Sequence, residues 1–345
     1  MKNKAAYMIA LDRMEFRDIS MPSPGPGEVL VKLEYVGICG SDVHYFHDGR
    51  CGDFVVDGDF ILGHECAGTV VELGEGVSSH QVGDRVALEP GITCGKCEFC
   101  KTGRYNLCPD VVFLATPPVQ GCYMNYIAFP ANMAFKLPDN IGTKEGALVE
   151  PLAVGIHSAN LAQIKPGDSV LILGAGCIGL VTMLACKAYG ATDITVVDIV
   201  PKRLEAAKKL GATHTINAAF TDLESEINKL TDGQGIEKVF EAAGSPATIV
   251  LTPHVVKRGG VIVLVGIAAV EEISFNFAKI MAKEIRMESV FRYRNIYPQA
   301  IAAISGGLID VSGIVTHEFD FDDIQNAFES AIRNKDEIVK AVIKM

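Results

Sequence analysis

The sequence predicts an α/β protein made of two differently built parts, and three observations support this. Up to about residue 150 the chain carries short β-rich runs interrupted by glycine and proline, a pattern typical of a β-barrel-like domain. From Gly167 onward, strand-like apolar runs alternate with helical patterns, which indicates a doubly wound parallel sheet with helices on both faces. A length of 345 residues is enough for about two such domains.

Each expected element follows from its local pattern. The β-rich runs of the first part are 28–36, 68–73, 84–88 and 126–129. In the second part, strands are expected at 170–173, 193–198, 238–241 and 260–266, and helices at 178–189 and 201–210. Pro201 suits the first turn of its helix, where a backbone N–H is not needed. After residue 288 the alternation stops, and helices at 298–305 and 321–333 precede a final apolar run at 338–343.

The composition excludes several classes of partner and location. The formal net charge is −11, and a surface that repels polyanions argues against nucleic acid as a partner. The apolar, uncharged stretch 169–186 contains three glycines, so a buried strand, turn and helix is favoured over a membrane span. The N-terminal residues lack the apolar segment of an export signal. Ten cysteines in such a chain indicate reduced thiols, metal ligation and a cytoplasmic location.

A dense group of cysteines predicts a structural zinc site. Cys94, Cys97, Cys100 and Cys108 form two overlapping C-x-x-C pairs and a fourth cysteine eight residues later, the spacing that four thiolates need around one zinc ion. The run contains no general base and leaves no coordination position open, so a structural role is favoured over a catalytic one. A nucleic-acid-binding zinc ribbon is the alternative, but the flanking charge is too mixed to follow a phosphate backbone.

A glycine motif predicts a dinucleotide site. Gly174, Gly176 and Gly179 form G-x-G-x-x-G after an apolar strand and before a helical pattern. In this context the second glycine lets the backbone approach a pyrophosphate, which lies at the helix N-terminus. Ile178, inside the motif, is assigned to the same coenzyme site. The alternative is a tight turn with no ligand.

The residue after the next strand bears on which coenzyme is bound. Asp198 follows Gly179 by nineteen residues, where a carboxylate hydrogen-bonds the diol of an adenosine ribose and repels a 2′-phosphate. NAD is therefore favoured over NADP. Arg203 leaves NADP open, because a nearby arginine accommodates a 2′-phosphate. The alternative is that Asp198 serves as a turn cap.

A second set of metal-binding residue types is spread over the first 150 residues. Cys39, His64, Glu65 and Glu150 lie in short segments marked by glycine or proline, and we expect all four in turns. A thiolate, an imidazole and a carboxylate supply the three protein ligands of a catalytic zinc and leave one position open. Taken singly, each has an ordinary alternative, namely a buried apolar cysteine, a core histidine or a solvated glutamate.

These motifs together resemble those of a known family. Gly63-His64-Glu65, the cysteine run, Val149-Glu150-Pro151 and the glycine motif occur in the order found in the zinc-containing medium-chain dehydrogenase/reductase family, and the resemblance covers essentially the whole chain. The segments 39–45 and 290–293 are similar to those of its polyol (sorbitol or xylitol) dehydrogenase branch.

The resemblance implies an architecture and a set of ligands. It implies a GroES-like β-barrel catalytic domain of residues 1–150 and 289–345, and a doubly wound Rossmann NAD-binding domain of residues 151–288. It implies two zinc ions per chain, one structural and one catalytic, with Cys39, His64 and Glu65 at the catalytic ion and Glu150 either binding it or holding its water. It implies a homo-oligomer, a tetramer or a dimer. The residues implied at the nicotinamide end of the coenzyme are Val265, Gly266, Ile267, Val290, Phe291 and Arg292.

The expected reaction is hydride transfer from a secondary hydroxyl of a polyol to NAD, which gives the ketose. Zinc acts as a Lewis acid that lowers the pKa of the bound alcohol. Ser41 and His44, with Glu150, are the candidate catalytic groups that move the proton, although a turn hydroxyl and a surface imidazole are the alternatives. The polar candidates for substrate binding are Tyr45, Glu150, Arg292 and Tyr293, and Phe113 is a candidate wall of the pocket.

Two rival functions stay open from the sequence. One is another activity within the same family, on L-threonine, butanediol or a simple secondary alcohol. The other is a zinc- and nucleotide-binding redox sensor without turnover. The complete set of Cys39, His64, Glu65 and Glu150 argues against the sensor, because a silent binder does not need an open metal site.

Overall fold

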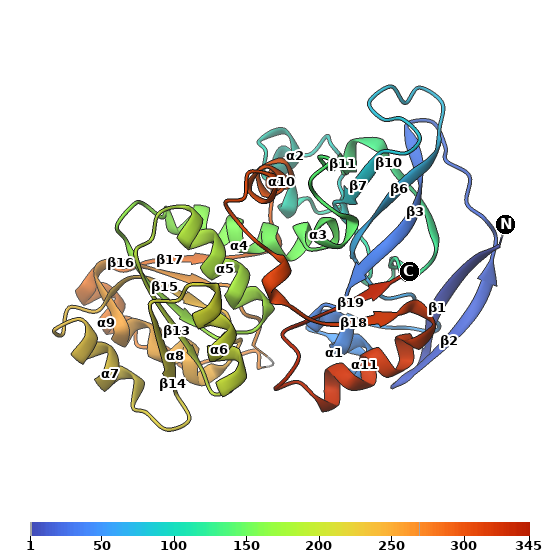
Figure 1. Ribbon diagram of the computed structural model, residues 1–345. Helices are drawn as coiled ribbons and strands as arrows, with labels where there is room; N and C mark the ends of the chain where they lie inside the picture. The colour runs from blue at the N-terminus through green and yellow to red at the C-terminus, as the bar shows by residue number, and fades with distance from the viewer. Residues whose placement is uncertain (1, 269) are drawn as a thin grey trace. The chain divides into compact units, whose positions relative to one another are not determined.

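The computed structural model describes residues 2–268 and 270–345 (Figure 1). The chain divides into two compact units. The first unit comprises 1–150, 297–307 and 315–345, and the second comprises 151–296 and 308–314.

Two short segments fall in a different unit from the one that the sequence analysis assigned to them. Residues 289–296 belong to the second unit, where Val290 N–H continues the sheet by donating to the Leu264 carbonyl at 2.9 Å. Residues 308–314 also belong to it, and a Cβ placed at Gly313 would lie 2.7 Å from Leu210 Cδ2. The exact domain boundaries therefore stay a prediction.

The first unit is built on a seven-stranded sheet in which the C-terminal strand lies between β3 (Glu28–Gly37) and the edge strand β18 (Val315–Asp320). The strand order is β11 (Ala134–Lys136), β7 (Arg85–Leu88), β6 (Glu65–Leu73), β3, β19 (Lys340–Lys344) and β18, and β10 (Tyr126–Pro130) also pairs with β3. Figure 1 shows β19, in red, between β3 and β18. A separate antiparallel pair, β1 (Asn3–Ala10) and β2 (Arg13–Ile19), is linked to the rest by isolated bridges.

The core of the first unit lies among these strands and one amphipathic helix. Helix α11 (Ile324–Arg333) buries Ile324, Ala327 and Phe328, which share one face because they are three and four residues apart. The Phe328 ring lies 5.0 Å from that of Phe46 on α1 (Gly40–Asp48). The smaller elements of this unit are β4 (Arg50–Cys51), β5 (Phe54–Val55), β8 (Gly91–Ile92), α2 (Glu98–Lys101), β9 (Val112–Phe113), α3 (Thr143–Ala147) and α10 (Tyr297–Ser305).

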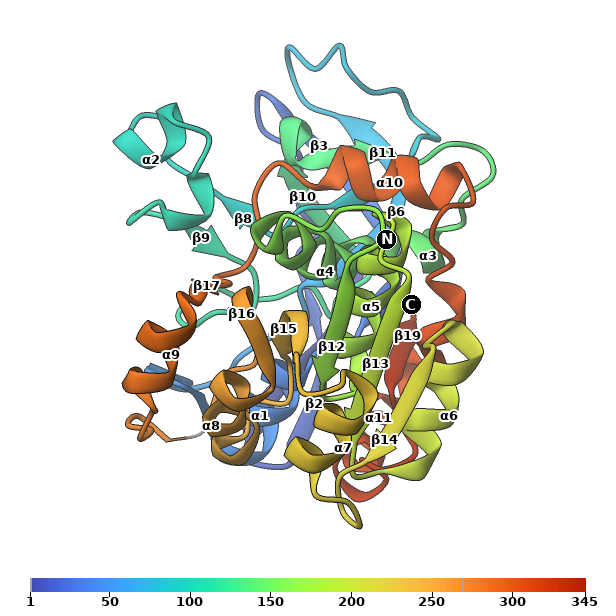
Figure 2. The ribbon, with the colours of Figure 1, turned by 90° about the vertical axis from the view of Figure 1, so that its left-hand side faces the viewer.

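The second unit is a six-stranded parallel sheet with a strand order that reverses once (Figure 2). The order is β14 (His214–Asn217), β13 (Asp193–Asp198), β12 (Ser169–Leu173), β15 (Ile236–Glu241), β16 (Val256–Leu264) and β17 (Arg286–Ser289). The chain runs from β12 outward to β14 and then returns to β15 on the other side of β12. The carboxyl ends of β12 and β15 therefore form a topological switch point, where open α/β sheets bind ligands.

Helices cover both faces of this sheet, as right-handed crossovers in opposite directions require. Helices α5 (Cys177–Ala188) and α6 (Pro201–Leu210) connect the strands on one side of the switch point. Helices α7 (Leu223–Leu230), α8 (Pro246–Val255) and α9 (Phe277–Lys283) form the other group. Helix α4 (Val149–Ala162) leads into the sheet from the first unit.

The predicted fold class, a β-barrel-like part and a doubly wound sheet, is confirmed. Several elements were not expected from the sequence, among them β1, β2, α1, α4, β14, α7, α8, α9, β17 and β18. The helix expected at 321–333 starts at Ile324, after a 3₁₀ turn at Phe321–Asp323. Within the ranges that the structure describes, no helix is both long and apolar enough to cross a membrane.

Candidate metal centre and dinucleotide site

Three of the predicted metal ligands converge in the first unit. One ligand atom each from Cys39, His64 and Glu65 lies within 4.8 Å of the others. The pairing of β3 with β6 places Gly37 opposite Glu65 and so brings the segment after β3 next to the start of β6. Cys39 is the N-cap of α1, and Glu65 is the first residue of β6 rather than part of a turn.

A carboxylate that the sequence analysis missed holds the segments together. Asp42 is fully buried, and its two oxygens accept the N–H of Cys39 at 3.1 Å and the N–H of Gly63 at 3.0 Å. The first of these bonds belongs to a capping box, whose acidic residue lies three positions after the N-cap. That spacing was the available signal in the sequence. Asp42 therefore ties the Cys39 segment to the His64 segment.

One ring nitrogen of His64 lies beside the buried carboxylate of Asp42. Its Nδ1 lies 3.6 Å from Asp42 Oδ1, which is an electrostatic contact too long for a hydrogen bond, and this leaves Nε2 for a metal. Gly63 has φ +90°, and a Cβ there would lie 2.9 Å from the Tyr123 ring. The Phe113 ring lies 5.7 Å from the imidazole, beside the candidate metal centre.

The charges of this cluster suit a bound cation. Burial lowers the pKa of His64, but the negative charges of Asp42 and Cys39 outweigh it and raise that pKa well above its usual value. A site that stabilises a proton on a buried imidazole also stabilises a dication there. Thiolate, imidazole and carboxylate are all ligands of zinc, and the donor set fits a site with one open position.

The other predicted catalytic and substrate residues of the first unit lie on two helices. Glu150 is buried in the first turn of α4, not in a turn as expected, and it is outside the three-residue cluster described above. On α1, Ser41 is half-buried, and His44 is exposed with Nδ1 at 3.0 Å from Asp48 Oδ2. Tyr45 is buried in the core of the unit, with its ring 6.3 Å from that of Phe60.

The four cysteines of the second predicted site also lie together. Ligand atoms of Cys94, Cys97, Cys100 and Cys108 lie within 4.8 Å of one another. The Sγ atoms of Cys97 and Cys100 are 3.5 Å apart, and those of Cys94 and Cys100 are 4.0 Å apart. A tetrahedron with Zn–S bonds of about 2.3 Å has edges of about 3.8 Å. Backbone N–H groups of Lys96 and Cys97 lower the pKa of Cys94 to about 7, which favours the thiolate that a metal needs.

A buried acid–phenol pair joins this cysteine segment to the sheet. Glu89 directly follows β7, is 3% exposed, and accepts a hydrogen bond of 2.6 Å from the Tyr105 hydroxyl. Burial raises the pKa of Glu89 to about 7, although the bond from Tyr105 opposes the shift.

The predicted dinucleotide motif lies at the switch point of the second unit. Gly174 has φ +104°, and a Cβ there would lie 2.8 Å from Ala243 N. A Cβ at Gly179 would overlap the Gly174 carbonyl, whereas a Cβ at Gly176 would meet nothing within 4 Å. The first and third glycines thus allow close packing, and the space above the second leaves room for a pyrophosphate at the N-terminus of α5.

Asp198 lies at the carboxyl end of β13, beside this motif. Its Oδ2 accepts the N–H of Ala175 at 2.7 Å, and its Oδ1 accepts the N–H of Val200 at 2.9 Å. Arg203 Nη1 lies 3.9 Å from the same carboxylate. Both residues that bear on coenzyme choice therefore lie at the same end of the sheet. Ile178, the fifth position of the motif, is in the first turn of α5.

The residues expected near the nicotinamide follow β16 and β17 at the same edge of the sheet. The backbone N–H groups of Val265 and Gly266 both donate to the Glu241 carbonyl. Ile267 is 80% exposed. Beyond β17, Val290 extends the sheet, and the Arg292 guanidinium lies 4.9 Å from the centre of the Phe291 ring. Arg292 has φ +55°, and Tyr293 after it is buried.

Glu241, at the end of β15, is a second residue that sequence reasoning missed. It is fully buried, and its carboxylate accepts hydrogen bonds from Ala243 N–H, Gly244 N–H and the Thr248 hydroxyl. These bonds fix the loop that adjoins both Gly174 and Gly266. A charged residue directly after the apolar pair Val239-Phe240, at the end of the strand, was the signal for it.

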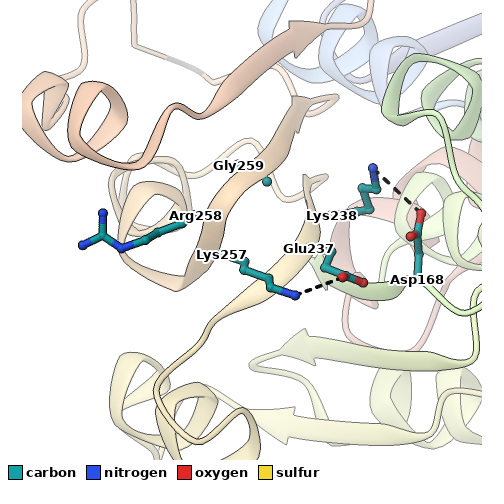
Figure 3. Close-up of a pocket in the computed structure, with 7 residues that line it drawn as sticks. Asp168, Glu237, Lys238, Lys257, Arg258 and Gly259 are labelled. Carbon is teal, nitrogen blue, oxygen red and sulfur yellow. Dashed lines mark hydrogen bonds and ion pairs between the residues drawn. The ribbon is translucent and has the colours of Figure 1, made fainter.

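A polar pocket of about 190 Å³ lies at the opposite end of this sheet (Figure 3). It is lined by residues at the amino ends of β12, β15 and β16. Four of its charged groups are paired, with Lys257 Nζ 3.1 Å from Glu237 and Lys238 Nζ 3.8 Å from Asp168 (Figure 3). The glycine motif is at the carboxyl ends, so this pocket is not the dinucleotide site.

Comparison with known proteins identifies the family. Residues 25–139 match the alcohol dehydrogenase GroES-like domain, and residues 177–306 match the zinc-binding dehydrogenase domain. The chain belongs to the zinc-binding dehydrogenase family. The family resemblance expected from the motifs is confirmed, and the protein is an oxidoreductase.

Relatives and solved structures match the chain over its whole length. It is 49% identical to an uncharacterised zinc-type alcohol dehydrogenase-like protein of Escherichia coli, with 100% of this chain and 99% of that protein covered. It is 44% identical to a sorbitol dehydrogenase of Bacillus subtilis, with 99% and 96% covered. A crystal structure of an Escherichia coli oxidoreductase of unknown specificity superposes with a TM-score of 0.96 at 48% identity, with 100% and 99% covered.

Proposed function

We propose that the protein is a zinc-dependent polyol dehydrogenase that transfers hydride from a secondary hydroxyl, as in sorbitol or xylitol, to NAD and forms the ketose. The observation that carries this proposal is the convergence of Cys39, His64 and Glu65 in a chain that also has an open glycine motif. A sorbitol dehydrogenase that is 44% identical over nearly the whole chain supports the polyol class.

The roles of individual groups follow from where they lie. Cys39, His64 and Glu65 hold the catalytic zinc, which supplies Lewis acidity to the substrate hydroxyl when it is bound. Glu150 either completes this site or orders a water beside it. Phe113, next to the His64 ring, forms an apolar wall that excludes water. Ser41 and His44 pass the released proton toward solvent along α1, because His44 is exposed and paired with Asp48.

The second zinc is structural and is held by the four cysteines from Cys94 to Cys108. Arg292 and Tyr293 supply polar contacts to the hydroxyls of a polyol. The Tyr45 hydroxyl supplies a further polar contact to the substrate. NAD is the coenzyme because Asp198 presents a carboxylate beside the glycine motif. When NAD binds, the Asp198 carboxylate would accept hydrogen bonds from the ribose diol in place of the one from the Ala175 N–H.

A substrate panel tests the proposal. Formation of NADH is measured with sorbitol, xylitol, 2,3-butanediol and L-threonine, with zinc content per chain determined on the same samples. We expect two zinc ions per chain and turnover with at least one of the two polyols. Activity confined to butanediol or threonine would replace the polyol class by the rival activity within the family.

A single substitution separates an enzyme from a redox sensor. Cys39→Ser removes one ligand of the candidate catalytic site and leaves the four cysteines untouched. We expect one zinc ion to remain and turnover to be lost. Full turnover in this variant would show that the cluster does not hold the catalytic metal.

We also propose a homo-oligomer, a dimer or a tetramer, in the cytoplasm. Strand β17 is at the edge of the parallel sheet, and the adjoining α9 exposes Phe277 at 70% and Met281 at 76%. Exposed apolar side chains beside an open sheet edge favour association. Light scattering of the wild type and of Met281→Glu measures the oligomeric state. A monomeric wild type would contradict the proposed homo-oligomer. Cell fractionation tests the location.

A further inference from the structure

A buried lysine on the C-terminal strand lies beside the candidate metal centre. Lys340, the first residue of β19, is 2% exposed, and it is the one fully buried lysine in the part of the chain that the structure describes. A lysine is almost never fully buried unless its charge is paired. Its Nζ forms an ion pair with Glu65 Oε2, and Glu65 is 1% exposed.

The same ammonium group also contacts the segment that carries Cys39. Lys340 Nζ donates to the Ile38 carbonyl at 2.9 Å, and the Ile38 N–H donates to the Ala341 carbonyl at 3.0 Å. Strand β19 therefore forms hydrogen bonds with both the carbonyl and the N–H of Ile38, the residue before Cys39. One side chain thus connects the two backbone segments that present Cys39 and Glu65.

The Glu65 carboxylate occupies a space that a glycine leaves open. Gly37 faces Glu65 in the β3–β6 register and Val342 in the β3–β19 register. A Cβ at Gly37 would overlap the Glu65 carboxylate and would lie 3.1 Å from Lys340 Cε. The position of the carboxylate is therefore set by two features, the vacant volume at Gly37 and the ammonium of Lys340.

We propose that Lys340 is a positioning residue, which holds one oxygen of Glu65 so that the other is presented to the cation bound by Cys39 and His64. The inference rests on the proposed catalytic metal site. It assigns the C-terminal strand a part in metal binding, although Lys340 is not itself a ligand. A carboxylate with one oxygen held by an ammonium binds as a monodentate ligand, and this keeps a coordination position open.

Three variants of this contact and one control test the proposal. Lys340→Met removes the ammonium, Lys340→Arg keeps a positive charge, and Gly37→Ala displaces the carboxylate while leaving the lysine. Lys344→Met is the matched control, because Lys344 is an exposed lysine on the same strand. The measurement is a titration with Co²⁺ of protein that keeps zinc at the four cysteines. Its readouts are the affinity and the visible spectrum of the bound Co²⁺.

We expect Lys340→Met and Gly37→Ala each to weaken Co²⁺ binding by about 10–100-fold, as loss of an outer-shell partner does. We also expect a weaker visible absorption in both, because a released carboxylate that binds through both oxygens raises the coordination number. Lys340→Arg should restore part of the wild-type spectrum, and Lys344→Met should match wild type. Zinc retained at the four cysteines shows that the first unit is folded.

Two results would overturn the inference. An unchanged Co²⁺ spectrum and affinity in folded Lys340→Met would show that the lysine only fills space. Tighter Co²⁺ binding in Lys340→Met would show that the ammonium competes with the cation for the carboxylate instead of positioning it. If Lys340→Met does not fold, unchanged or tighter Co²⁺ binding in Gly37→Ala would overturn the inference instead. A wild type that binds no Co²⁺ at this cluster would refute the proposed function itself, which is a distinguishable outcome.

Discussion

The buried acid Glu89 makes the stability of the first unit depend on pH. Its carboxyl group, 3% exposed and bonded to the Tyr105 hydroxyl, has a pKa that burial raises from 4.5 to about 7. In the unfolded chain the same group titrates at its ordinary value. Between these two values the folded protein therefore keeps a proton that the unfolded chain has already lost, and stability falls as the pH rises.

The size of this effect follows from the two pKa values. Relative to acid conditions, the destabilisation is about 2 kcal/mol at pH 6 and about 3 kcal/mol at pH 8.5, beyond which it no longer grows. Raising the pH from 6 to 8.5 thus removes about 1 kcal/mol of stability through this one group. The substitution Glu89→Gln removes the ionisation and keeps an oxygen that accepts the Tyr105 hydrogen bond.

The assay compares the free energy of urea unfolding of zinc-loaded wild type and Glu89→Gln at pH 6 and pH 8.5. We expect the stability of the variant relative to wild type to increase by about 1 kcal/mol over this range. Glu98→Gln is the control, because the Glu98 side chain is 77% exposed in the same cysteine segment. Parallel pH profiles for wild type and Glu89→Gln would refute the reasoning.

Three further predictions concern the metal sites and the coenzyme. Asp42→Asn removes the charge that faces His64 and one acceptor of the bonds to Cys39 and Gly63, so Co²⁺ affinity at that cluster should fall by about 10-fold; unchanged affinity in a titration contradicts this. Cys100→Ser leaves three thiolates at the structural site, so metal analysis should find one zinc ion per chain instead of two, and two retained ions would count against that site. Asp198→Ala should lower the ratio of kcat/KM for NAD to that for NADP, and an equal ratio in wild type and variant would remove the role assigned to this carboxylate.

Much of the fold is encoded locally and could be predicted from the sequence. The strand at 193–198 and the helix at 201–210 have the predicted bounds, because alternating and helical patterns act over a few residues. The N-terminal pair β1 and β2 was missed, and so was α4. In α4, Pro151 suggested a turn around Glu150, but proline is tolerated in the first turn of a helix.

The sequence alone determined the features whose parts are neighbours along the chain. The four cysteines lie within fifteen residues, and the glycine motif within six, so their spacing already limits how their atoms can be arranged. The order of strands and helices likewise predicted a doubly wound sheet.

Only the tertiary structure decided how the candidate catalytic centre is assembled. Cys39 and Glu65 meet because β3 pairs with β6 in one register, and Lys340 reaches both because β19 pairs with β3 from the far end of the chain. Sequence separation carries no information about such distances. The partners of a buried charge are chosen by the packing of strands, because a lysine or carboxylate without a partner would not remain buried.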